Sequence, residues 1–175
     1  FLNPTIYRVA ASVVLLMVAG GIGFWYVDRQ AKEAELLALR QEMEATRKMV
    51  FALLDNNESA SQRLMGVKAA YETPKHDDAI VQALVREMNE DDNANVRLSA
   101  IEALGRFSNE SLVRKALVES LSNQTDPVVQ LALIQVLVQI KEKDALKSLQ
   151  KMSEDDAVLP SVRDEAHAGI IKINV

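Results

Sequence analysis

Hydrophobic and polar positions follow three different patterns along the chain. An uncharged apolar stretch runs from Val9 to Val27. A charged stretch without Gly or Pro follows, from Ala31 to Leu54, and its apolar positions recur every three or four residues. Beyond it, short amphipathic segments at helical spacing alternate with turn-forming residues. Together these patterns predict an all-α protein with several helices of very different length.

The stretch 9–27 has the length and composition of a transmembrane helix. At about 1.5 Å per residue it would span roughly 28 Å, close to the hydrocarbon thickness of a bilayer. Phe24, Trp25 and Tyr26 lie at one end, as aromatic residues do at membrane interfaces. A buried core helix is the alternative. We predict an N-terminal flank over 1–8, a single transmembrane helix over 9–27, and these three aromatic residues at the interface.

The orientation of the predicted span stays open. Basic residues favour the cytoplasmic side, and those that follow the stretch outnumber Arg8, the basic residue before it. The chain begins with Phe1 rather than Met, so we expect further sequence upstream and an incomplete count of charges. We expect a single-pass membrane protein whose C-terminal part is extracytoplasmic (periplasmic), with the opposite orientation as the alternative.

Residues 28–45 predict a helical stalk, because good helix formers dominate them. The apolar positions that follow the a/d pattern of a coiled coil are Leu36, Leu39, Met43, Thr46, Val50 and Leu53. This stripe could pair with a second copy or dock on the chain's own C-terminal part. Ala19 and Gly23 have the small-x-x-x-small spacing that lets membrane helices approach closely. A homodimer through the membrane helix or the stalk is therefore one predicted partnership.

Residues 46–175 repeat themselves. Three copies align at a spacing of 33 residues: Val96, Val129 and Val162; Arg97, Gln130 and Arg163; Leu104, Leu137 and Ile170. A spacing of 34 places Arg63 of an earlier copy opposite Arg97, and the same step back from Leu84 reaches Val50. The last turns of the stalk are thus predicted to be the first helix of the first repeat. Since one helix pair cannot bury its apolar face alone, we predict an α-solenoid of about four stacked pairs.

The repeats resemble a known family. Residues 96–105 read Val-Arg-x-x-Ala-x-x-Ala-Leu-Gly, and residues 126–129 read Asp-Pro-Val-Val. With the period, these motifs resemble HEAT repeats, most closely the short bacterial kind also found in phycobilin lyases, over roughly residues 46–173. Gln130 departs from the pattern, where Arg is expected, and so does His167, where an apolar residue is usual. The resemblance implies that an Asp caps a helix and pairs with a repeat Arg. Residues that match these roles are Asp92, Asp126, Arg97 and Arg163.

Charge and composition exclude several kinds of chemistry. The formal net charge is −5, without the basic excess that sequence-independent nucleic-acid binding requires. The absence of cysteine excludes disulfides, thiolate zinc sites and cysteine nucleophiles. His76 and His167 lie far apart, and His76 with the acidic residues after it is typical of a helix start rather than a metal site. We therefore expect no cofactor, no metal and no enzyme activity.

What remains is a protein-binding surface. Solenoids usually bind partners on the concave face lined by the second helix of each repeat, where positions one period apart form columns. The candidate binding residues on these columns are Ser99, Glu102, Arg106, Gln135, Gln139, Glu165 and Lys172. Their mixed, weakly charged character favours a protein or peptide over a nucleic acid.

Three functions compete. An upstream region, a single span, a stalk and HEAT-like repeats together are similar in layout to bacterial anti-sigma factors, in which a membrane helix separates a cytoplasmic sigma-binding region from an extracytoplasmic sensor. That layout predicts the sensor or regulatory half of a membrane-anchored signalling protein. The alternative is a membrane-tethered scaffold or adaptor without a signalling role. An enzyme of the lyase-like group would need a reactive or pigment-binding site that these residues do not supply.

Overall fold

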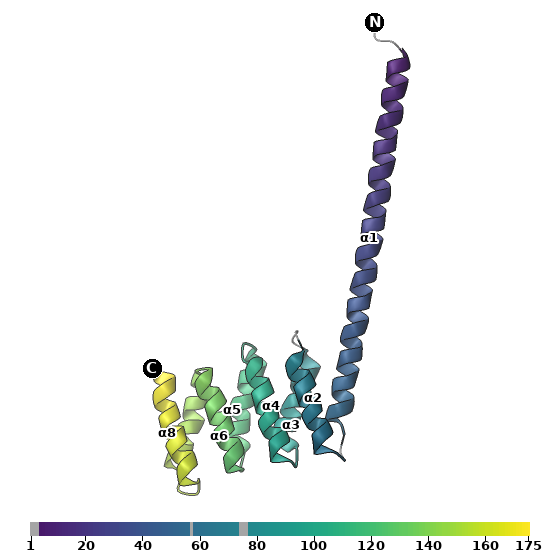
Figure 1. The fold of residues 1–175 in the computed structure, drawn as a ribbon. Helices are drawn as coiled ribbons and strands as arrows, with labels where there is room; N and C mark the ends of the chain where they lie inside the picture. Colours follow the sequence, from purple (N-terminus) through teal and green to yellow (C-terminus); the bar gives the residue numbers. More distant parts are fainter. Residues whose placement is uncertain (1–3, 57, 74–76) are drawn as a thin grey trace. The chain divides into compact units, whose positions relative to one another are not determined.

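The computed structural model describes the backbone of residues 4–56, 58–73 and 77–175 (Figure 1). In the first helix it describes the side chains of Met17, Trp25, Arg29, Gln30 and all residues from Lys32 onward. The chain divides into two compact units, Phe1–Thr46 and Arg47–Val175. This boundary lies next to position 46, where the repeats were predicted to begin.

The first unit consists of helix α1, Pro4–Leu54, whose last turns belong to the second unit. Side chains from Lys32 to Ala45 are all exposed. In the described part of this unit, Arg29 forms an ion pair with Glu33, at 3.4 Å between Nε and Oε1, and stacks over Trp25. The predicted stalk is therefore a helix.

Across the residues that the structure describes, no helix combines the length and apolar content needed to cross a bilayer. This finding contradicts the predicted location as a single-pass membrane protein with periplasmic repeats. The physical reason lies in the described part of α1, where charged groups such as Glu35, Arg40 and Glu42 recur and would be costly in hydrocarbon. Within the predicted span over 9–27, only Met17 and Trp25 have described side chains. The predicted interface residues Phe24 and Tyr26 lie outside the described side chains.

The second unit is built from helices alone in its described part. After the end of α1 come α2 (Ala60–Glu72), α3 (Asp78–Glu90), α4 (Ala94–Arg106), α5 (Ser111–Asn123), α6 (Pro127–Gln139), the 3-10 helix η1 (Lys143–Ala145), α7 (Leu146–Glu154) and α8 (Pro160–Asn174). They stack as four helix pairs, with α2, α4, α6 and α8 side by side in one row (Figure 1). The predicted all-α solenoid is confirmed.

One continuous core joins the pairs. Leucines one period apart, such as Leu84 with Leu117 and Leu104 with Leu137, are fully buried. Val50 is also fully buried, which agrees with the predicted use of the last turns of α1 as the first helix of repeat one. Because each helix pair packs on the next, the apolar faces of neighbouring repeats cover one another.

Short polar side chains set the helix starts. Asp77 accepts hydrogen bonds from the backbone N–H groups of Ala79 and Ile80 at the start of α3. Asp126 does the same for Val128 and Val129 at the start of α6, with Pro127 in the first helical position. Pro74 and His76, which the sequence suggested as a break and a helix start, lie outside the described residues.

The last pair presents a polar outer face. Ile101 and Ile134 are fully buried at one repeat position, whereas His167 occupies the same position in α8 and is exposed. His167 is the residue that departs from the apolar pattern in the sequence. Its exposure gives the departure a physical reason, since α8 has no described helix beyond it to bury this position.

Candidate functional site

A groove of about 1010 Å³ opens along α4 and α6. Its floor is apolar and includes Leu98, Ala132 and Val136. Polar side chains from the same two helices line its rim, and the turns that follow α4 and α6 close one end. The groove therefore lies on the row of second helices, where the sequence placed the binding surface.

Four of the predicted binding residues line this groove together. They are Glu102, Arg106, Gln135 and Gln139, and all four side chains are exposed. Ser99 lies instead in an adjoining hollow of about 290 Å³ between α2 and α4, which Glu102 also lines. The predicted columns thus converge on two neighbouring hollows.

The remaining two candidates are on the last helix. Glu165 and Lys172 form an ion pair with each other, at 3.5 Å between Oε1 and Nζ. Neither lines the groove between α4 and α6. The structure therefore separates them from the other candidates.

Arg106 connects two repeats at the rim. Its guanidinium lies 4.9 Å from the centre of the Tyr71 ring and donates a hydrogen bond to the Tyr71 carbonyl. Tyr71 belongs to α2 and lines both hollows. Sequence reasoning missed Tyr71, although it occupies the repeat position of Gly105 and was the one aromatic residue there.

A second ion pair fixes the far end of the groove. Arg114 of α5 contacts Glu142, at 3.0 Å between Nε and Oε2, and donates to the carbonyls of Ser108 and Asn109. This arginine holds together the two turns that close the groove. Lys141, with a positive φ of 53°, is exposed beside it. The sequence analysis missed this arrangement because it joins a first helix to a turn of the following repeat.

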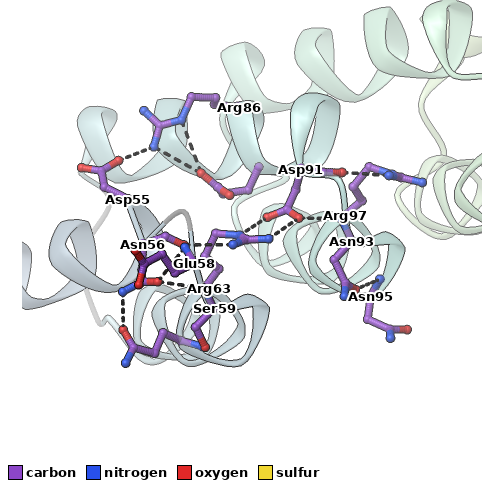
Figure 2. A network of polar contacts seen from close by, with 12 residues as sticks. Asp55, Asn56, Glu58, Ser59, Arg63, Arg86, Asp91, Asn93, Asn95 and Arg97 are labelled. Atoms are coloured by element: carbon purple, nitrogen blue, oxygen red, sulfur yellow. Dashed lines mark hydrogen bonds and ion pairs between the residues drawn. The ribbon is translucent and has the colours of Figure 1, made fainter.

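A ladder of Arg–Asp pairs joins successive repeats (Figure 2). In its first rung, Asp91 accepts hydrogen bonds from Arg63, at 2.6 Å from Nε and 2.9 Å from Nη2. Asp91 also accepts from the backbone N–H of Asn93 at 2.7 Å, and its side chain is 1% exposed. Asn93, not the predicted Asp92, is the N-cap of α4, and Asp92 is exposed.

The second rung repeats this geometry one repeat further. Arg97 donates to Asp126 of the next turn, at 2.5 Å, and to the Asp91 carbonyl of its own turn, at 2.8 Å. Gln130 keeps the contact with its own turn, donating to the Gln124 carbonyl, but forms no ion pair. Arg163 contacts Asp156 within the last repeat, at 2.5 Å. The ladder therefore spans the first three repeats, and the third copy departs from it at Gln130.

Two carboxyl groups beside the first rung have opposite pKa shifts. Burial raises the pKa of Glu87, and a hydrogen bond shared with Asp91 raises it further against the opposing charge of Arg86. Burial would also raise the pKa of Asp91, but the hydrogen bonds from Arg63 and the Asn93 N–H outweigh it, so this pKa is lowered. Arg86 also contacts Asp55, at 2.7 Å. Glu87 is thus the group that holds a proton most readily in this cluster.

These shifts predict a stability maximum in mild acid. The folded pKa of Glu87 lies above its ordinary value of 4.5, so its contribution is present below pH 4.5 and is lost as the pH rises through the folded pKa. The contribution of Asp91 is present above pH 3.8 and is lost as the pH falls through its lowered folded pKa. Urea unfolding between neutral and strongly acidic pH should show stability rising and then falling. Glu87→Gln should flatten the rise, and parallel profiles for both proteins would contradict this assignment.

Comparison with known proteins agrees with the geometry. A family model described as HEAT repeats matches residues 78–170, which is 93 of the 175 residues and runs from α3 into α8. No curated protein and no solved structure gives a significant match. The match confirms the predicted repeat type and carries no information about an anti-sigma-like layout. The chain belongs to the HEAT-repeat family.

Proposed function

We propose that the groove between α4 and α6 binds an extended segment of a partner protein. HEAT repeats commonly mediate protein–protein interaction, and this supports the general class of function. The observation that carries the proposal is the convergence of Glu102, Arg106, Gln135 and Gln139, from two successive repeats, on one groove.

The chemistry of the lining suits a polypeptide. Gln135, Gln139 and Asn109 carry amides that both donate and accept hydrogen bonds, as the backbone of an extended segment does. The apolar floor can receive small side chains between these contacts. Charges of both signs, Glu102 with Arg106 and Lys141, leave the groove without the strong positive field that nucleic acids require.

The proposed role is binding without catalysis. The lining of the groove contains no histidine, and its charged side chains include two that are already held in the Arg114–Glu142 ion pair. These features give little support to acid–base chemistry. A regulatory role and a scaffold role both require such a binding surface, and the choice between them stays a prediction.

A displayed library of short random peptides tests the proposal. Peptides selected on the full chain should bind about tenfold or more weakly to the double variant Gln135→Ala and Gln139→Ala, because two amide hydrogen-bonding groups are lost. Alanine suits a helix, so the variant should keep its fold, which circular dichroism can verify.

The matched control is the double variant Lys115→Ala and Glu119→Ala. These residues form an exposed ion pair on α5, a first helix, and neither lines the groove. Selected peptides should bind this variant as tightly as the unchanged protein. Equal affinity for all three proteins, or a selective loss in the α5 variant, would contradict the proposed site.

A further inference from the structure

The described part of α1 carries an apolar stripe with no partner in the first unit. Leu36, Leu39 and Met43 are 50%, 46% and 45% exposed. They follow the a and d positions of a heptad, so they lie along one side of the helix. The stripe is therefore a candidate seam for a second helix.

The sequence limits the seam at both ends. The preceding a and d positions are Arg29 and Lys32, which are charged. The next a position after Thr46 is Val50, which is buried in the solenoid core. The available seam runs from Leu36 to Thr46, less than two heptads, so any association through it is weak and depends on concentration.

The charges beside the seam select the partner and its direction. In this register Glu35 and Glu42 occupy g positions, and Arg40 and Arg47 occupy e positions. In a parallel pair each g residue faces the e residue five positions further along the other helix, so every Glu meets an Arg. An antiparallel pair would bring the glutamates toward glutamates and the arginines toward arginines. The pattern fits a second, parallel copy of the same helix.

The groups needed for this pairing are available. Glu35 and Arg40 form no ion pair with any residue that the structure describes. Arg47, by contrast, already contacts Asp77 at 3.5 Å. The contact between Glu35 of one copy and Arg40 of the other is therefore the one that the register supports best.

We propose that two copies of this chain associate in parallel through α1. Leu36, Leu39 and Met43 form the seam, and Glu35 of each copy faces Arg40 of the other. This association does not depend on the groove, and it would place two solenoid units on one dimer.

The absence of cysteine allows a direct test with the full chain. Leu39→Cys places a thiol at a d position, where parallel helices bring identical residues close enough for a disulfide. Gln41→Cys places it on the outer side of the same helix and is the matched control. Under mild oxidation at high protein concentration, Leu39→Cys should give about tenfold more disulfide-linked dimer than Gln41→Cys. Equal yields, or no dimer from either, would overturn the proposal.

Charge exchange tests the direction of the pairing. In the Leu39→Cys background, Glu35→Arg alone and Arg40→Glu alone should each lower the dimer yield, because like charges then face each other. A mixture of the two variants, one carrying an affinity tag, should restore the yield as a mixed dimer, in which both charge pairs are again opposite. A mixture that dimerises no better than its components would overturn the parallel register.

Discussion

Asp91→Ala is expected to lower the free energy of unfolding by about 3 kcal/mol, near the lower end of the cost of breaking a buried ion pair. The substitution leaves the Arg63 guanidinium without its carboxylate partner and removes the acceptor for the Asn93 N–H. Arg63 is 13% exposed, so partial hydration keeps the cost toward the lower end. Urea unfolding at neutral pH measures the effect.

The matched control is Asp156→Ala in the last repeat. Asp156 also contacts an arginine, Arg163, but its side chain is 99% exposed. Solvent screens an exposed pair of this kind, so no measurable loss of stability is expected. Similar losses in the two variants would show that burial does not set the strength of the Arg–Asp contacts.

Gly66→Ala is expected to cost about 1–3 kcal/mol through overpacking. A Cβ at this position of α2 would lie 2.9 Å from both Cδ2 and the backbone N of Leu54. The side chain can rotate, but the backbone atom cannot move without separating α2 from the end of α1. Thermal unfolding should show a clear decrease in Tm.

Gly105→Ala is the control for this substitution. There the nearest atom to a new Cβ is Cγ1 of Val136, at 3.4 Å, which is ordinary contact. Alanine favours the helical backbone over glycine by roughly 0.5–1 kcal/mol, so this variant should be as stable as the unchanged protein or more stable. A larger loss from Gly105→Ala than from Gly66→Ala would contradict the packing described for the first repeat.

The repeat fold could be predicted because its signal is periodic. Val96, Val129 and Val162 are all fully buried, as a spacing of 33 residues requires of a shared core. The groove could be predicted in part for the same reason, since Glu102 and Gln135 are one period apart. A column of equivalent positions translates directly into a row in space.

The features that the sequence did not reveal join positions that are not equivalent. The Arg114–Glu142 pair connects a first helix to a turn, and Tyr71 contributes to the groove from a neighbouring repeat. The choice between Asp91 and Asp92 depends on which carboxylate the turn buries, and adjacent acidic residues look alike in a sequence. The predicted single-pass location depended on composition alone, and the search of the described helices contradicted it.

Mapping amide chemical shifts by NMR while titrating a selected peptide tests the central claim most directly. Binding in the groove predicts that the largest changes lie along α4 and α6, at Glu102, Arg106, Gln135 and Gln139. Changes centred on α5, at Lys115 and Glu119, or spread without a maximum on the second helices, would contradict the assignment of the groove as the binding site.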